Sequence, residues 1–261
     1  MASEPVGPEV DGADAPLKSV GRALAALNLL VDAAPRTVRV TDVARRLEID
    51  SATAHRLLAT LVSHRYASRM PNRTYTVGPR SLSMATAWLR RLRAAASAPL
   101  ARVAAATGET VVVVQLLGDY PVALEWRRPQ TGAPLLPRPT DSYPLWATAG
   151  GRALLSVLPK SQRAGLLPEE PFPSLTGQTT TGWSDLHGQL RDGIRDGLFF
   201  EQGEVDPRLW CCAVPLDRGT GGEVLSLSVI VEGEPAAAQR GRIQRVLRHE
   251  SRRVGHALSG R

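Results

Sequence analysis

The chain has few cysteines, very little lysine and no long apolar run. Its two cysteines, Cys211 and Cys212, are adjacent, which leaves neither a disulfide framework nor the spacing of a zinc-binding motif. No stretch reaches the roughly 18 to 20 apolar residues that a membrane-spanning helix needs. Residues 1–16 carry four acids and no base, unlike the positive start of a secretory signal. We therefore expect a cytoplasmic protein with no membrane partner and no bound metal.

Motifs that carry catalytic chemistry are also missing. The sequence contains no G-x-S-x-G nucleophile turn, no G-x-x-x-x-G-K-S/T phosphate loop and no H-E-x-x-H zinc motif. The adjacent thiols could suggest redox sensing, but both lie in an apolar run, where inert thiols are commoner. We therefore expect no enzyme, no catalytic residue and no cofactor.

The composition is that of a folded protein with an excess of positive charge. Of the 261 residues, 43% are hydrophobic and 22% charged, which is enough for one large domain or two modest ones. The net charge is +7, and all basic residues except Lys18 and Lys160 are arginines. Because a GC-rich coding sequence could produce that skew alone, the total charge is weak evidence for a polyanionic partner.

The distribution of charge is more informative than its total. Residues 1–16 have a net charge of −4, residues 17–93 hold 14 basic and 4 acidic residues, and residues 94–261 hold 18 and 17. Almost the whole excess therefore lies in one third of the chain. This asymmetry predicts a module that binds phosphates beside a neutral module with another task.

Hydrophobic periodicity in the basic third predicts three helices and a hairpin. A first helix runs from Ser19 to Pro35, a second begins with Thr41 as its N-cap, and a third covers 51–64. Two short strands, 66–69 and 74–77, follow with a Pro-Asn turn between them. This order is that of a winged helix-turn-helix, whose third helix enters the major groove of DNA.

The remainder predicts a mixed α/β domain. A connecting helix from Leu82 is interrupted at Pro99, and a further short helix ends at Gly108. The apolar stripe of the connecting helix could pack on the first domain or on a second copy of the chain. We expect strands at 110–117, 122–127, 134–138, 198–201, 211–216 and 223–231, with a turn at 217–222, and helices at 146–158, 183–195 and 235–258. In the helix 183–195, Leu186, Leu190 and Ile194 share one face.

Several segments together resemble the IclR family of bacterial transcriptional regulators. They are the first-helix segment 19–27, the third-helix segment Ser51-Ala52-Thr53-Ala54-His55-Arg56-Leu57-Leu58, the wing end 75–78, the segment Pro144-Leu145-Trp146-Ala147-Thr148-Ala149-Gly150-Gly151-Arg152 and the last strands, 211–229. The recognition-helix match is the most specific of these. The resemblance covers about residues 17–259.

The resemblance implies an α+β protein in four parts. These are a disordered acidic arm (1–16), a winged helix-turn-helix DNA-binding domain (17–80), a linker helix (81–97) and a GAF-like α/β effector-binding domain (98–261). It implies a homodimer or a dimer of dimers, associated with the nucleoid, in which a small-molecule effector changes binding to a double-stranded DNA operator. The alternative is a constitutive DNA-binding protein whose second domain only oligomerises.

Candidate DNA contacts lie on the third helix and the wing. Ser51 and Thr53 are expected to bond phosphates near the helix N-terminus, and His55 and Arg56 to reach base edges. Arg73 in the wing and Arg22 in the first helix complete the set. Other arginines, such as Arg45 and Arg46, are more often part of a solvated face. We expect DNA affinity to fall steeply with salt and the isolated body from Ala94 onward not to bind DNA.

The family pattern also implies effector contacts. It places them at Ala149, Gly150, Glu201, Cys211 and Ser228, with Trp146 at a position where histidine is common. Taken alone, Ala-Gly-Gly is a tight turn and Cys211 a buried small hydrophobe. Because Trp146, Trp210 and Ile230 make the site more apolar than the family pattern, we expect a ligand larger and less charged than a simple keto acid.

Overall fold

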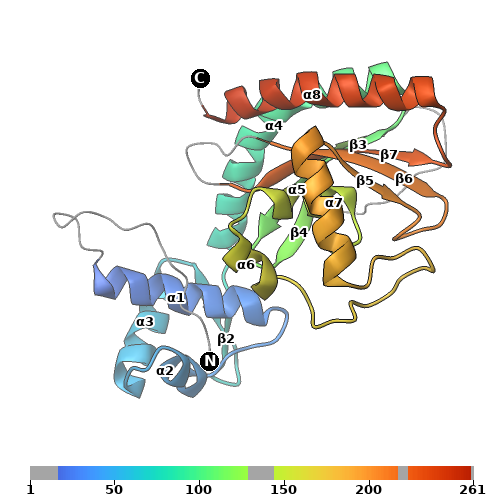
Figure 1. Cartoon of the computed structure of the whole chain (residues 1–261). Coiled ribbons are helices and arrows are strands. Elements are labelled where there is room, and N and C mark those ends of the chain that lie inside the picture. Colours follow the sequence, from blue (N-terminus) through green and yellow to red (C-terminus); the bar gives the residue numbers. More distant parts are fainter. Residues whose placement is uncertain (1–16, 129–143, 217–222, 260–261) are drawn as a thin grey trace. The chain divides into compact units, whose positions relative to one another are not determined.

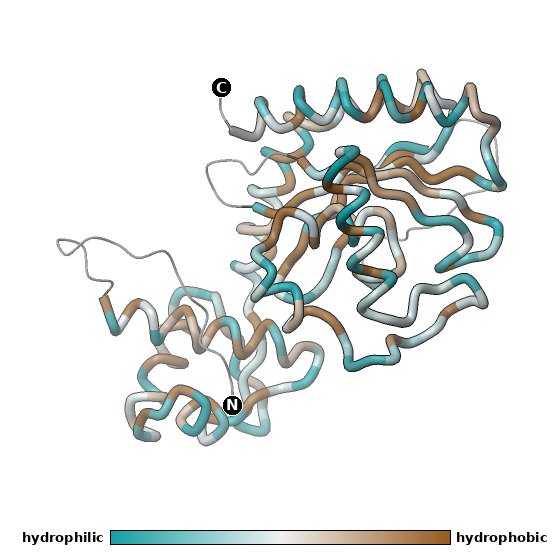
Figure 2. Tube along the Cα trace, in the orientation of Figure 1, coloured by the Kyte–Doolittle hydropathy of each residue, from teal (hydrophilic) through white to brown (hydrophobic). Residues whose placement is uncertain are grey.

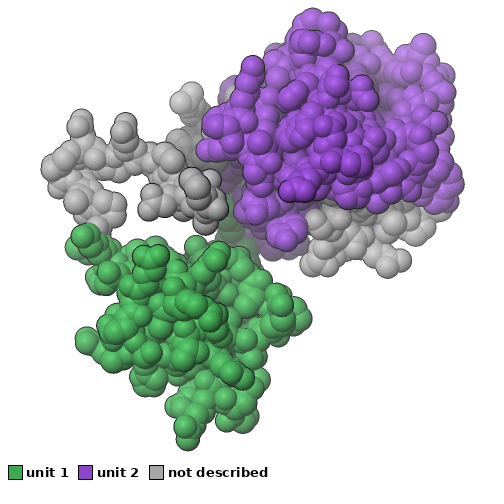
Figure 3. All heavy atoms as spheres, turned by 60° about the horizontal axis from the view of Figure 1, so that its bottom comes forward, with its two compact units in different colours: residues 1–88 green, residues 89–261 purple. Residues whose placement is uncertain are grey.

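The computed structural model describes residues 17–128, 144–216 and 223–259. The chain divides into two compact units, residues 1–88 and 89–261 (Figure 3). Three expectations fall outside the described residues, namely the acidic arm 1–16, the strand 134–138 and the turn 217–222. None of the described helices is long and apolar enough to cross a membrane.

The first unit contains the predicted three helices and hairpin. They are α1 (Lys18–Ala33), α2 (Val40–Arg46), α3 (Ser51–Ser63), β1 (Ala67–Arg69) and β2 (Tyr75–Val77), and the two strands pair antiparallel (Figure 1). The apolar stripes of the helices meet in one core with the base of the hairpin. Its fully buried members include Ala26, Leu30, Val43, Ala54, Leu58 and Tyr75.

Local hydrogen bonds set where these helices begin. Asp50 is the N-cap of α3, and its carboxylate accepts hydrogen bonds from the Thr53 amide (2.8 Å) and hydroxyl (2.7 Å). The expected N-cap of α2, Thr41, is wrong, because α2 begins at Val40 with Arg39 as its N-cap. The Asp42 carboxylate accepts a bond from the Arg39 amide at 3.2 Å. Asp42 lies three residues after the N-cap Arg39, and its carboxylate fixes the start of α2 better than the Thr41 hydroxyl would.

A single long helix, α4 (Arg80–Thr107), replaces the two helices expected on either side of Pro99. A proline inside a helix costs about 3 kcal/mol through its missing N–H and its ring. The apolar stripe continues on both sides of it, however, because Leu92, Leu100 and Val103 are fully buried. Burying such side chains contributes roughly 1.5 to 3 kcal/mol each, which outweighs the proline. The helix instead ends before Gly108, whose φ is 76°.

The second unit is built on a five-stranded antiparallel sheet. The strands are β3 (Thr110–Leu117), β4 (Tyr120–Arg127), β5 (Phe199–Gln202), β6 (Leu209–Pro215) and β7 (Leu225–Glu232), in the order β4-β3-β7-β6-β5. The helices after α4 are α5 (Ala149–Ser156), α6 (Lys160–Gly165), α7 (Trp183–Asp196) and α8 (Ala237–Ser259). The helix α5 is shorter than expected at its start because Thr148 caps it, its hydroxyl accepting from the Gly151 amide at 3.0 Å.

Helices cover both faces of this sheet (Figure 1). On one face, α5 and α7 form a core with the inward side chains of β5 and β6, such as Phe199 and Ala213. On the other face, α8 packs on β6 and β7, and α4 is joined to β4 by the Arg93–Glu125 ion pair (2.8 Å). One expectation for α7 is wrong: Ile194 is 52% exposed. Gly193 takes the buried position instead, because the Phe199 ring lies directly against it.

Candidate functional site

The outer face of α3 is polar and exposed, as its sequence predicts. Ser51, His55 and Arg56 are all exposed, while Leu58 on the opposite side is fully buried. The hydroxyl of Thr53 is less available than expected, because it donates its proton to Asp50. That hydrogen bond lowers the pKa of the Asp50 carboxyl.

Exposed arginines lie on several elements of the first unit besides α3. Arg73 lies in the turn of the hairpin with a φ of 59°, and Arg22 is exposed on α1. Asn72 holds the turn, its side-chain oxygen accepting from the Thr74 hydroxyl (2.5 Å). Arg45 is held by Asp42 at 2.9 Å, which favours its interpretation as part of a solvated face. The other exposed arginines of the described part of this unit are Arg36, Arg39, Arg46, Arg65, Arg69 and Arg80.

In the second unit, the start of α5 lies directly over two strand hydroxyls. A Cβ atom on Gly150 would come within 2.9 Å of the Ser228 hydroxyl and 3.4 Å of the Ser226 hydroxyl. Only a glycine allows this approach. Both hydroxyls are buried, and neither has a hydrogen-bond partner within the described part of the chain. A buried polar group without a partner costs free energy, so such a pair marks a place where a ligand can supply the missing bonds.

Strand register places further candidate residues on the same face of the sheet. Cys211 is opposite Glu201 on β5 and opposite Ile230 on β7, two residues from Ser228. The Glu201 carboxylate accepts bonds from the amides of Glu204 (2.7 Å) and Val205 (3.3 Å). Glu201, Cys211, Ser228 and the Gly150 turn are thus assembled on the α5 face of the sheet.

Burial changes the acidity of these groups. Desolvation raises the pKa of the Glu201 carboxyl, partly offset by its hydrogen bond with the Cys211 thiol. Burial and the nearby Glu201 charge raise the pKa of Cys211 well above its ordinary value. Burial raises the pKa of Cys212, on the opposite face, to about 12. Both thiols therefore stay protonated, which argues against a reactive thiolate pair.

Trp146 makes contacts of a packing kind. Its indole N–H donates to the Pro173 carbonyl at 3.3 Å, and its ring lies 5.8 Å from that of Phe172. Phe172 in turn packs against Trp183. These contacts direct the polar edge of Trp146 to a loop rather than to Ser226 and Ser228.

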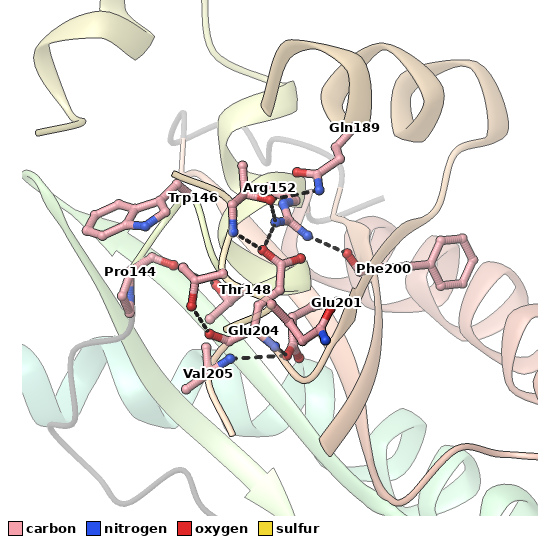
Figure 4. A network of polar contacts seen from close by, with 12 residues as sticks. Pro144, Trp146, Thr148, Arg152, Gln189, Phe200, Glu201, Glu204 and Val205 are labelled. Carbon is pink, nitrogen blue, oxygen red and sulfur yellow. Dashed lines mark hydrogen bonds and ion pairs between the residues drawn. The ribbon is translucent and has the colours of Figure 1, made fainter. Parts of the chain in front are cut away.

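The polar network around Arg152 was not predicted from the sequence (Figure 4). Its side chain is 1% exposed and forms an ion pair with Glu204 at 2.5 Å. It also donates to the Phe200 carbonyl (2.7 Å), while Thr180 donates its amide proton to Glu204 (3.0 Å). Because Glu204 also donates its amide to Glu201, the network ties α5 to the turn that positions Glu201.

Ser226 is a further site residue that the sequence reasoning missed. In the sequence, Ile230 makes the surroundings of Ser228 more apolar, whereas the structure adds a buried hydroxyl from Ser226. The two-residue period of a strand indicates Ser226, because residues two apart, such as Ser226 and Ser228, share a face of the sheet. The site therefore has one hydroxyl more than expected.

A basic winged helix-turn-helix unit followed by a helix-covered antiparallel sheet defines a DNA-binding transcriptional regulator with a separate C-terminal domain. Comparison with known families agrees: residues 19–71 match the IclR helix-turn-helix domain and residues 85–255 match the bacterial transcriptional regulator IclR C-terminal domain. The chain belongs to the IclR family of transcriptional regulators.

Relatives of known name are regulators of the same kind. The chain is 29% identical over 205 residues to the probable transcriptional regulator SauR of Cupriavidus necator, covering 77% of this chain and 81% of that protein. It is 27% identical to the HTH-type transcriptional regulator Rv1719 of Mycobacterium tuberculosis, covering 89% of this chain and 87% of that protein. Both relatives are named as transcriptional regulators and not as enzymes.

Solved structures share the fold. A putative IclR regulator from Silicibacter sp. TM1040 superposes with a TM-score of 0.71 at 21% identity, over 93% of this chain and 97% of that one. An IclR homologue from Microbacterium hydrocarbonoxydans, solved in complex with 4-hydroxybenzoate, gives a TM-score of 0.62 at 22% identity, over 94% and 100%.

Proposed function

We propose that this regulator is ligand-responsive: α3 and the wing bind an operator, and a small organic molecule bound on the α5 face of the sheet changes that binding. The observation that carries the proposal is the pair of buried hydroxyls without partners, Ser226 and Ser228, beneath Gly150. An oligomerisation domain alone would have no reason to keep this unfavourable pair. The 4-hydroxybenzoate complex of the Microbacterium hydrocarbonoxydans homologue supports a ligand site in this fold.

For the DNA-binding surface we propose roles by position. Ser51 lies at the start of α3 and bonds phosphate. Thr53 donates both its amide and its hydroxyl proton to Asp50, so it bonds a phosphate oxygen only if its hydroxyl turns away from Asp50. His55 and Arg56 read base edges from the middle of the exposed face. Arg73 in the wing and Arg22 on α1 bind the DNA backbone.

The two classes of contact are separable by mutation. Arg56→Ala is expected to weaken specific binding by about 1 to 3 kcal/mol and to relax one operator position, while Arg73→Ala weakens all sequences alike. Titrated gel shifts with an operator found by genome-wide footprinting, and with scrambled duplexes, measure both effects. Unchanged operator affinity of Arg56→Ala would contradict this docking.

For the effector we propose an organic molecule that carries an oxygen acceptor and little charge. Ser226, Ser228 and the N–H groups of Ala149 and Gly150 supply donors. Glu201 and Cys211 close the site on the β5 side, where a second carboxylate would be repelled by an ionised Glu201. Trp146, whose indole N–H is already given to the Pro173 carbonyl and whose ring packs on Phe172, would contribute apolar surface and no hydrogen-bond donor to the ligand.

The serine pair gives a direct test. Replacing both Ser226 and Ser228 by alanine removes no hydrogen bond of the ligand-free protein, so its thermal midpoint should stay the same or rise. A thermal-shift panel of aromatic and aliphatic acids, amides and alcohols should stabilise the wild type and the exposed control Ser184→Ala, but not the double variant. If the panel shifts the double variant equally, or only small dicarboxylates stabilise the wild type, this site is wrong.

We further propose a homodimer or a dimer of dimers at the nucleoid. Exposed apolar side chains recur at Leu17, the N-cap of α1, and on α1 at Val20, Leu24 and Val31. Two more, Leu82 and Met84, lie on the first turns of α4. Such a stripe on a regulator of palindromic sites is suited to burial against a second copy.

The alternative function, a constitutive DNA-binding protein whose second domain only oligomerises, is distinguished by measuring the coupling between ligand and DNA. Any ligand that alters the DNA affinity must have its own affinity altered by the same factor.

A further inference from the structure

The helix α8 concentrates positive charge in a unit that is nearly neutral as a whole. Its 23 residues include six arginines and a single acid, Glu250. That acid is turned inward, with only 5% of its side chain exposed. Two hydrogen bonds from Arg102 on α4, of 2.9 and 2.7 Å, already satisfy it. The near-zero net charge of the unit therefore hides a helix whose outer side has no negative charge.

The basic residues of α8 lie on one side of the helix. Ile243, Leu247, Glu250 and Val254 are buried and define the inner side. The opposite side repeats basic residues at three- and four-residue steps and is exposed throughout; it consists of Arg242, Arg245, His249, Arg252, Arg253 and His256. We call these six residues the α8 stripe. At 1.5 Å per residue the stripe is about 21 Å long. Figure 2 shows hydrophilic and hydrophobic residues alternating along the helix α8.

Neighbouring acids act on the beginning of α8 and on Arg248 in its middle, which lies outside the stripe. Arg248 donates to the Asp196 carbonyl and, after the larger effect of the Arg195 hydrogen bond, lowers the pKa of the Asp196 carboxyl. Arg240 pairs with Glu234, and the charge of Arg242 acts on Glu109. Further along, Arg253 is 4.0 Å from Glu250, whose carboxylate is already held by Arg102. Arg245 and Arg252 have no carboxylate within ion-pair distance among the described residues.

The side chains of the stripe point to the chemistry of its partner. None of the large exposed hydrophobic residues of the described chain lies on α8. Protein interfaces depend on apolar or aromatic anchors, and a helix lying in a membrane surface needs an apolar outer side. A phosphate backbone, in contrast, needs only charge and hydrogen-bond donors, which arginine supplies.

We propose that the α8 stripe is a second DNA-contacting surface, which binds the phosphate backbone of duplex DNA without regard to sequence. It acts in addition to α3 and the wing of the first unit. The proposal differs from the expectation that the isolated body from Ala94 onward does not bind DNA, because that expectation rests on the summed charge of the body. The stripe adds counterion release, and hence salt dependence, to the binding of any duplex.

The experiment measures DNA affinity of the full chain over a salt series, with a random-sequence duplex of several helical turns. Arg245→Gln, Arg252→Gln and Arg253→Gln together should lower the slope of log K against log salt by about 2 to 3, since each phosphate that is no longer neutralised reduces the slope by roughly 0.9. The affinity at low salt should fall about tenfold or more. The matched control, Arg191→Gln, Arg195→Gln and Arg208→Gln, removes the same charge from exposed positions elsewhere in the unit and should leave slope and affinity unchanged.

Two further variants make the result decisive. Arg→Lys at the same three α8 positions keeps the charge and should restore the slope. In an Arg56→Ala/Arg73→Ala background, the three glutamine substitutions should lower the remaining salt slope by the same amount, about 2 to 3, because the two surfaces contribute independently. The proposal is overturned if the α8 variant keeps the wild-type slope, if the control weakens binding as much, or if only single-stranded RNA binding disappears while duplex DNA binding is unchanged.

Discussion

At the scale of single residues, the buried ion pair between Arg152 and Glu204 is the strongest structural constraint near the candidate effector site. Removing one member of such a pair leaves the other charge buried without compensation, which costs about 3 to 5 kcal/mol. We expect Arg152→Met to lower the free energy of unfolding by that amount in urea titrations. Arg195→Met, which breaks an exposed ion pair with Asp192 and Asp196, should leave it unchanged.

The burial of Glu201 predicts how the free energy of unfolding depends on pH. Its pKa in the folded protein lies above the usual 4.5, chiefly because it is buried. Between 4.5 and the folded value the native state binds more protons than the unfolded state, so stability falls as the pH rises through that window. Glu201→Gln keeps the acceptor for the Glu204 and Val205 amides and removes the titration. Its stability relative to the wild type should therefore rise with pH above 4.5 in urea titrations, and a constant difference would contradict a raised pKa.

The sequence revealed some of these residues and not others. Glu201, Cys211 and Ser228 were found through the family pattern, and the strand register brings them to one face. Ser226 could have been found from the two-residue strand period. Arg152 could not, because its partner Glu204 is 52 residues away and the sequence does not specify which carboxylate a buried arginine will meet.

At the scale of secondary-structure elements, the packing of α7 on β5 depends on a missing side chain. A Cβ atom on Gly193 would lie 2.2 Å from the Phe199 ring. Gly193→Ala should therefore destabilise the protein by about 1 to 3 kcal/mol through overpacking, measured by thermal or urea unfolding. Gly188 in the same helix has only the end of the Arg191 side chain nearby, so Gly188→Ala should stabilise by up to about 1 kcal/mol. Equal effects of the two substitutions would exclude this packing argument.

Elements with a strong period and local caps were predictable, whereas interruptions decided by packing were not. The helix α3 was found because an apolar stripe and an exposed polar face leave one solution. The helix α4 continues through Pro99, because a local rule about proline does not include the burial of Leu92, Leu100 and Val103 around it. The exposure of Ile194 has the same cause, because the choice between neighbouring positions on α7 depends on Phe199 from β5.

At the scale of the whole molecule, charge summed over a domain conceals how it is arranged. The summed charge correctly separated a basic winged helix-turn-helix from a neutral body. It did not indicate that the body places its single α8 acid inward and its arginines outward, because a sum over residues contains no geometry. Helical periodicity applied to charge, rather than to hydrophobicity alone, would have revealed the α8 stripe.

The boundary between the two compact units falls inside one helix, at residues 88 and 89 of α4. A continuous helix can transmit a change in one unit to the other only if it stays rigid. Ala85 and Ala87 are exposed and close to this boundary. Replacing both by glycine costs about 1 kcal/mol each in helix propensity and makes the segment more flexible, while each folded unit keeps its own contacts.

We therefore expect Ala85→Gly/Ala87→Gly to retain DNA binding and ligand binding but to remove the coupling between them. The measurement is the ratio of DNA affinities with and without the panel compound that gives the largest thermal shift, and the reciprocal ratio of compound affinities with and without DNA, which must agree. Ala101→Gly/Ala105→Gly, at exposed positions of α4 wholly inside the second unit, carries the same helix cost and should keep the wild-type ratio. An unchanged ratio in the first variant would mean that coupling does not pass through α4.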